Sequence, residues 1–100
     1  MPKAKQADGA VKLEDLPNIG RATAADLRRL GIQRPGQLVG QDPLAMYDEL
    51  RRLSGVKQDP CVLDVLMAAV RFMEGGPALP WWAFTAERKQ MLKNRGADRP

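Results

Sequence analysis

The sequence predicts an all-α fold, a single small domain of about five helices. No segment alternates apolar and polar residues at period two for long enough to form a strand. Aspartate-proline pairs at 42–43 and 59–60 are typical helix starts, because aspartate caps the first amides and proline suits the first helical position. Gly31, Gly55 and Gly75 follow apolar helical patterns and indicate helix ends. A length of 100 residues allows one domain with one modest core.

The two ends of the chain differ in composition from its middle. Residues 1–11 are polar and charged and include an Asp-Gly pair, so we expect a disordered tail there. The folded domain is expected to span residues 12–95, with residues 96–100 as a second disordered tail. A short helix over residues 13–16 should open the domain.

The next predicted helix begins at residue 20 or 21 and extends to about residue 30. Its inward-facing positions share helical spacing and are Ile19, Thr23, Leu27 and Leu30. Gly31 is expected to end this helix as a left-handed C-cap. Pro35 then starts a short helical turn that reaches about residue 39.

Three further helices are predicted, and the middle one should be the most buried. The helix over 43–54 has an apolar stripe on one side and charged residues on the other. The helix over 60–74 is apolar nearly all round, which is typical of a central element. Thr85 is the expected N-cap of a last helix over 86–95.

A tight hairpin is predicted immediately before the second helix. Pro17 presets a turn, Asn18 is one of the few non-glycine residues that tolerate left-handed φ, and Gly20 tolerates it without steric cost. The helix that follows leaves unpaired backbone N–H groups and the positive end of its dipole at its start. Arg21 and Thr23 lie in that first turn, where they can add a charge and a hydroxyl. This combination predicts a phosphate site.

These residues resemble the helix-hairpin-helix motif, whose usual pattern is L-P-G-I-G before a small, threonine-containing helix and a glycine-isoleucine stop. The match covers residues 13–38. In that family the hairpin amides bind the sugar-phosphate backbone without reading bases, so the resemblance implies sequence-independent binding of double-stranded DNA. The residues placed at the phosphates are Asn18, Ile19, Gly20, Arg21 and Thr23, with Arg28 and Arg29 beside them on the same helix. Because Asn18 stands where the family has glycine, we expect weak binding.

A wider resemblance covers residues 13–88. The segments at 41–43, 59–65 and 80–82 are similar to the bacterial pathogenicity-locus family, some of whose members are labelled mitomycin resistance proteins. The hairpin is also similar to the C-terminal domain of bacterial competence regulators. That second similarity leaves a protein-interaction module open as an alternative function.

Composition excludes several kinds of chemistry. The chain has one cysteine and no histidine, which excludes an internal disulfide, the usual zinc sites and the histidine-dependent catalytic pairs. Neighbouring carboxylates such as Asp48 and Glu49 diverge on a helix and form no acid-base pair. We therefore expect a protein that is not an enzyme and has no metal or cofactor. Cys61 is expected to be a packed, unreactive side chain.

The net charge of +4 is unevenly distributed. Residues 13–87 carry eight basic and ten acidic side chains, so the excess of positive charge lies in the two ends. Basic ends can anchor a domain to DNA, but they also serve as solubilising segments. An acidic folded part is one observation that favours the interaction module. Its contact surface would be Trp81-Trp82 or Arg51-Arg52, rather than the hairpin.

Two further features bear on partners and location. The segment 53–57 has the apolar-glycine-apolar form of a second, degenerate hairpin, and Arg51 and Arg52 would flank it. Trp81 and Trp82 are expected to cover the open end of the core, with one of them partly exposed. No apolar stretch is long enough to span a bilayer, so we expect a cytoplasmic protein without a membrane partner. The sequence leaves the oligomeric state open.

Overall fold

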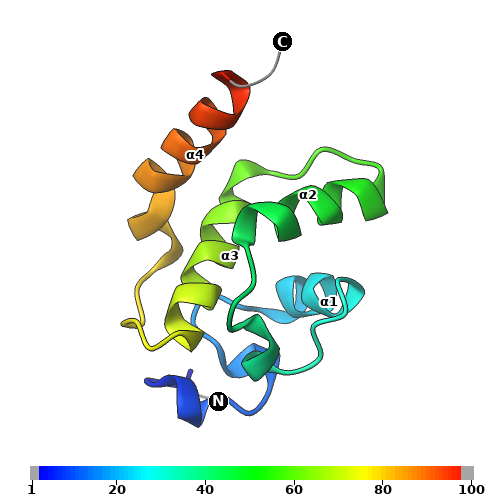
Figure 1. Ribbon diagram of the computed structural model, residues 1–100. Helices are drawn as coiled ribbons and strands as arrows, with labels where there is room; N and C mark the ends of the chain where they lie inside the picture. The colour runs from blue at the N-terminus through cyan, green and yellow to red at the C-terminus, as the bar shows by residue number, and fades with distance from the viewer. Residues whose placement is uncertain (1–2, 98–100) are drawn as a thin grey trace.

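A computed structural model describes residues 3–97, and the regular secondary structure among them is all helical, with no strand. The part described contains four α-helices, which are α1 (Arg21–Arg29), α2 (Pro43–Ser54), α3 (Pro60–Met73) and α4 (Thr85–Ala97) (Figure 1). It also contains four 3₁₀ turns, which are η1 (Ala7–Gly9), η2 (Leu13–Asp15), η3 (Pro35–Leu38) and η4 (Trp81–Phe84). The all-α prediction is confirmed. The short helix expected over 13–16 is a single 3₁₀ turn.

Helix starts and ends lie where the local sequence signals place them. Asp42 Oδ1 accepts a hydrogen bond from Leu44 N at 2.9 Å and caps α2. Asp59 Oδ1 accepts one from Cys61 N at 2.9 Å and caps α3. Gly55 ends α2 with φ of 71°. These are local effects, because an N-cap carboxylate and a left-handed glycine act within one helical turn.

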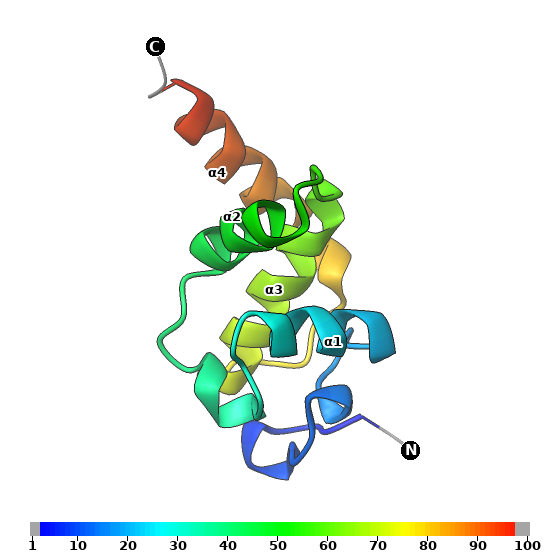
Figure 2. The same cartoon turned by 90° about the vertical axis from the view of Figure 1, so that its right-hand side faces the viewer.

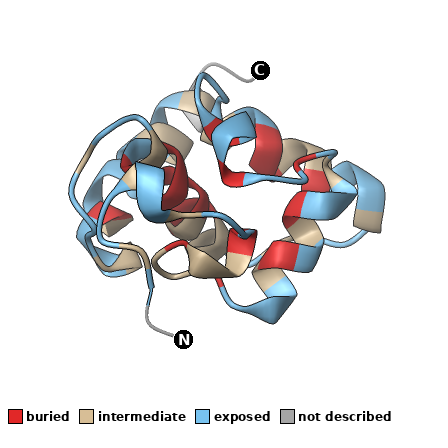
Figure 3. Cartoon of the chain, turned by 90° about the horizontal axis from the view of Figure 1, so that it is seen from below, coloured by how far each residue is buried: buried red, intermediate tan, exposed pale blue. Residues whose placement is uncertain are grey.

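The helix α3 is the centre of the core, as its apolar sequence predicts. It packs against α2, α4, η3 and η4. Its fully buried apolar residues include Leu63, Leu66 and Ala69. Figure 3 shows the buried positions concentrated on the inward faces of the surrounding helices. The helix α1 lies across the same core below α2 in the view of Figure 2, and its fully buried residues are Ala24 and Leu27.

The start of α4 differs from the expectation for Thr85. Thr85 has helical backbone angles, φ −59° and ψ −42°, and continues from η4 directly into α4. Its hydroxyl donates to Asp64 Oδ2 at 2.7 Å instead of capping the helix. The N-cap prediction is therefore wrong, because a buried carboxylate on α3 takes the hydroxyl. The helix continues to Ala97, and its last turns extend beyond the other helices in Figures 1 and 2.

A buried ion pair joins α3 to α4. Asp64 is 0 % exposed, and its Oδ1 accepts a hydrogen bond from Arg88 Nε at 2.8 Å. Its Oδ2 accepts from the Thr85 hydroxyl at 2.7 Å and from Arg88 Nη2 at 3.4 Å. No buried side-chain nitrogen or oxygen lacks a hydrogen-bond partner in the part of the chain described here. The carboxylate is tolerated in the core because each of its oxygens is paired.

Part of the segment expected as an N-terminal tail packs on the domain. Ala4 N donates to Asp15 O at 2.8 Å, and Ala4 and Ala10 are partly buried against the core. Of the residues assigned to the two tails, 1–2 and 98–100 lie outside the described residues. No helix over residues 3–97 has the length and apolar character that a bilayer crossing needs.

The buried pair gives a direct stability prediction. Arg88→Met leaves Asp64 as an uncompensated buried charge, so we expect the free energy of unfolding to fall by about 3 to 5 kcal/mol. Glu87→Gln is the matched control on the same helix, because its pair with Arg71 joins side chains that are 50 % and 53 % exposed. That change should alter stability by less than about 1 kcal/mol. Urea unfolding followed by circular dichroism measures both, and equal losses would contradict this account.

Candidate nucleic-acid interface

The hairpin predicted at residues 17–20 is present and connects η2 to α1. Ile19 N donates to Leu16 O at 3.2 Å, which closes a turn around Pro17 and Asn18. Asn18 has φ of 70°, and it is the only non-glycine residue with positive φ in the stretch 3–97. Proline followed by a residue with positive φ is the arrangement of a type II turn. Ile19 is 0 % exposed and fixes the turn to the core.

Gly20 does not have the left-handed conformation that the sequence suggested. Its φ is −93° and its ψ is −171°, which is extended backbone, so that expectation is wrong. The physical reason is that Asn18 already reverses the chain, and the residue before a helix usually has β-region angles. A Cβ added at Gly20 would meet no atom within 4 Å. The position therefore tolerates a side chain, and what glycine contributes is an open approach to the start of α1.

The start of α1 has free backbone donors. Gly20 provides no side-chain cap for α1. The first amide within α1 that has a backbone acceptor is that of Ala24, which donates to Gly20 O at 2.9 Å. Among residues 3–97, no acceptor is found for the amides of Arg21, Ala22 and Thr23. The starts of α2 and α3 are instead occupied by aspartate carboxylates. Free amides and a helix dipole at one point form a favourable environment for an anion.

The side chains predicted for phosphate contact have different roles in the structure. Arg21 is exposed at the start of α1, and Thr23 is half-buried in the same turn. Ile19 points its side chain into the core. Asn18 Nδ2 donates to Leu79 O at 2.9 Å, and Asn18 Oδ1 accepts from Trp81 N at 3.2 Å. Both polar atoms of the Asn18 side chain are thus engaged with the 79–82 segment.

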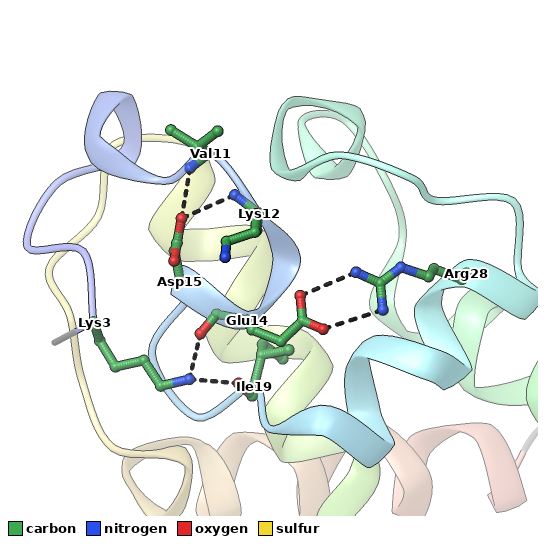
Figure 4. Close-up of polar contacts among 7 residues, drawn as sticks. All are labelled: Lys3, Val11, Lys12, Glu14, Asp15, Ile19 and Arg28. Atoms are coloured by element: carbon green, nitrogen blue, oxygen red, sulfur yellow. Dashed lines mark hydrogen bonds and ion pairs between the residues drawn. The ribbon is translucent and has the colours of Figure 1, made fainter. Parts of the chain in front are cut away.

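The two arginines farther along α1 are paired with carboxylates. Arg28 forms two hydrogen bonds with Glu14, at 3.0 and 3.2 Å (Figure 4). The Arg28 guanidinium holds the pKa of Glu14 below its ordinary value. Arg29 lies 3.9 Å from Asp26 on its own helix. Neither arginine is free of an ion pair, so a phosphate would have to compete with a carboxylate for each.

Lys3 is a cation at the hairpin that the sequence analysis missed. Its Nζ donates to the carbonyl oxygens of Glu14 and Ile19, and Figure 4 shows it pointing at the hairpin from the N-terminal segment. Near Lys3, the Asp15 carboxylate accepts hydrogen bonds from the backbone amides of Lys12 and Val11, and these bonds hold the pKa of Asp15 below its ordinary value. No local pattern could have placed Lys3 here, because the contact joins residues that are 16 positions apart.

The segment 53–57, predicted as a second hairpin, differs from the first at the start of the helix that follows it. Gly55 has positive φ, but the Asp59 carboxylate caps the first amides of the helix that follows, α3.

Beside the segment 53–57, a groove of about 260 Å³ lies between α2, the start of α3 and α4. Its charged lining residues are Asp48, Arg51, Lys57 and Arg95. Asp48 and Arg95 form an ion pair at 2.6 Å across this groove.

The tryptophan pair is only partly a core element. Phe84 is 3 % exposed and covers the core end, whereas Trp82 is 64 % exposed. Trp81 is half-buried, and the two indole rings meet edge to face with centroids 5.5 Å apart. The expectation that one tryptophan stays partly exposed is confirmed. The role of closing the core belongs mainly to Phe84.

The cysteine and the carboxylates show no reactive arrangement. Burial raises the pKa of the half-buried Cys61 thiol, and the neighbouring Asp59 carboxylate raises it further. The thiol is therefore protonated at neutral pH, as a packed side chain would be. In the stretch from 3 to 97, no three histidine, cysteine, aspartate or glutamate side chains converge on a common point.

Comparison with known proteins places this small all-helical domain in a family. The family described as pathogenicity locus matches residues 6–90, and the chain belongs to that family. The mitomycin resistance protein McrB of Streptomyces lavendulae is 43 % identical over 93 residues, which cover 93 % of this chain and 88 % of that protein. No solved structure matches the chain. The family expected from the motifs at 41–43, 59–65 and 80–82 is confirmed.

Asn18 gives a testable prediction about the hairpin. Asn18→Ala keeps a Cβ in the left-handed region and removes both hydrogen bonds to the 79–82 segment, so we expect a loss of about 2 to 3 kcal/mol. Asn18→Gly removes the same hydrogen bonds but suits positive φ, and should lose about 1 kcal/mol less. Chemical denaturation of the two variants measures the difference. Equal stability of Asn18→Ala and wild type would show that neither the turn nor the hydrogen bonds matter.

Proposed function

We propose that this chain binds the phosphate backbone of double-stranded DNA, without reading base sequence, through a helix-hairpin-helix made of η2, the turn at 17–20 and α1. The observation that carries the proposal is the uncapped start of α1. Free amides of Arg21, Ala22 and Thr23 point out of a helix whose neighbours α2 and α3 are capped by carboxylates. Backbone N–H groups and helix dipoles bind phosphate regardless of the attached base.

Local charge supports this proposal better than the composition of the whole folded part. Four cations lie at or next to the hairpin, and they are Lys3, Lys12, Arg21 and Arg28. Two carboxylates, Glu14 and Asp15, accompany them, and both accept hydrogen bonds within the domain. The surroundings of the hairpin are thus positive although residues 13–87 as a whole are not. A positive local field is what attracts a phosphate.

The second hairpin at 53–57 would contribute side chains rather than amides. Asp59 already accepts from the first free amide of α3, and its charge repels a phosphate there. Arg51 and Lys57 remain at the rim of the groove and can contact a neighbouring phosphate. One complete phosphate site and one degenerate copy imply weak binding of duplex DNA. A role of this kind needs no catalytic residue and would be carried out in the bacterial cytoplasm.

A protein-interaction module is the second candidate function. The observation that favours it is the groove between α2 and α4, whose polar and apolar lining suits an acidic segment of a partner protein. In this case the Arg51 and Arg52 region would be the contact site and the hairpin would be a structural turn. The relative's name, a mitomycin resistance protein, is compatible with either candidate. DNA binding is favoured because the open amides have no structural role.

A carboxylate placed on the free amides tests the leading proposal. Gly20→Asp should fold as well as wild type, because aspartate is a favoured N-cap and its Cβ meets open space. It should lose most of its affinity for duplex DNA, because the new carboxylate occupies the amides and repels phosphate. Gly20→Ala is the control, which adds a methyl group without charge and should lose less. Fluorescence anisotropy at low salt measures binding. Unchanged affinity of a folded Gly20→Asp protein would reduce the hairpin to a structural turn.

Salt dependence provides an independent test with charge-matched variants. Arg21→Ala should weaken duplex binding and reduce the slope of log K against log salt by about 0.9, the value of one phosphate contact. Lys93→Ala removes the same charge from the exposed part of α4 and should leave the slope nearly unchanged. Glu14→Gln releases Arg28 from its ion pair, so this variant should bind more tightly than wild type by a few-fold. Identical slopes for Arg21→Ala and Lys93→Ala would contradict a specific role for Arg21.

A further inference from the structure

Trp82 is an exposed aromatic side chain in the segment that contacts the hairpin. It is 64 % exposed, and Leu79 in the same segment is 39 % exposed. The Asn18 side chain holds this segment through Leu79 O and Trp81 N. The residue that forms the hairpin turn therefore also holds the backbone at Leu79 and at Trp81, immediately before Trp82. The turn that precedes the proposed phosphate site consequently lies against the segment that carries the exposed indole.

The backbone that carries Trp82 is well ordered by its surroundings. Trp82 lies in η4, whose last residue Phe84 is buried in the core. Ala83 N donates to Pro80 O at 3.0 Å and closes the turn. The Trp81 and Trp82 rings meet edge to face, with an interplanar angle of 85°. Such support limits the freedom that Trp82 would lose on binding, which favours a role in recognition.

Core packing does not explain Trp82. Phe84 fills the core position at this end of the domain, and Trp82 leaves most of its ring in water. Indole has a large apolar surface, so a ligand that covers its exposed face gains a favourable contact. An aromatic ring beside a phosphate site is the usual arrangement in proteins that bind single-stranded nucleic acid, because bases stack on such rings while cations contact the backbone.

We propose that Trp82 stacks on an unpaired base of DNA whose phosphates are bound at the hairpin. This inference rests on the proposed function and names its ligand more closely, as a junction between duplex and single strand. Bases inside a duplex are covered by their neighbours, so only an unpaired base offers a face to the ring. Every base has such a face, and the contact therefore stays independent of sequence. It complements a hairpin that reads phosphates alone.

The test compares three DNA ligands with equal numbers of phosphates. They are a blunt duplex, a duplex with a single-stranded extension, and the same duplex with an abasic extension. Wild type should bind the duplex with the base-containing extension about tenfold more tightly than the other two, a typical effect of one stacked base. Fluorescence anisotropy at matched salt measures the three affinities.

Two variants at one position assign the effect to the ring. Trp82→Ala should lose the preference for the extension and keep the affinity for the blunt duplex. Trp82→Phe retains an aromatic face and should keep much of the preference. Circular dichroism and thermal unfolding confirm that both variants fold. Quenching of tryptophan emission by the extension, reduced in Trp82→Phe, is the accompanying spectroscopic signal.

The outcomes separate this inference from the proposed function. Equal binding of the three ligands, a preference that survives in Trp82→Ala, or tight binding of the abasic extension would each overturn the inference. Salt-sensitive duplex binding that depends on Arg21 would leave the proposed function standing in all three cases. Failure of wild type to bind any of the ligands would overturn both. A Trp82→Ala protein that binds DNA normally but loses a purified protein partner would assign Trp82 to a protein interface.

Discussion

The left-handed backbone of Asn18, with the two hydrogen bonds of its side chain, is the constraint on which the candidate site depends. The positive φ reverses the chain between η2 and α1, which leaves Gly20 extended and the first amides of α1 uncapped. The side chain reaches Leu79 and Trp81, residues more than 60 positions away, and joins the hairpin to the segment before α4. One residue thus positions both the candidate phosphate site and the aromatic segment. Glycine could form the same turn but could not make the second connection.

Most of the carboxylates named above form hydrogen bonds or ion pairs within the domain, and this makes the proposed phosphate site compatible with an acidic folded part. Asp42 and Asp59 cap helices, Asp64 is buried against Arg88, and Glu14 is paired with Arg28. Each of these negative charges is met locally by amides or by a guanidinium group. Among residues 3–97, no carboxylate accepts a hydrogen bond from the first amides of α1. Net charge over a whole domain is therefore a poor guide to the field at one helix start.

The sequence predicted the features that depend on neighbours along the chain. The aspartate-proline starts, the left-handed Gly31 and Gly55 and the buried α3 all follow from signals within one or two helical turns. The features that it missed depend on tertiary contacts. Thr85 was predicted as an N-cap, but its hydroxyl donates to the buried Asp64. Lys3 was assigned to a disordered tail, but its Nζ donates to hairpin carbonyl oxygens. The left-handed conformation was expected at Gly20 as well as at Asn18, but Asn18 alone reverses the chain in this turn. Whether the hairpin binds DNA stays a prediction.

The central claim is that the free amides at the start of α1 bind phosphate, and amide NMR tests it most directly. An isotope-labelled chain is titrated with a short DNA duplex, and the chemical shifts of all backbone N–H groups are followed. The account predicts that the largest changes occur at Gly20, Arg21, Ala22 and Thr23, with little change at the start of α3, where Asp59 already accepts from Cys61. Changes confined to the groove between α2 and α4, or absent at the start of α1 when the duplex is bound, would contradict the account.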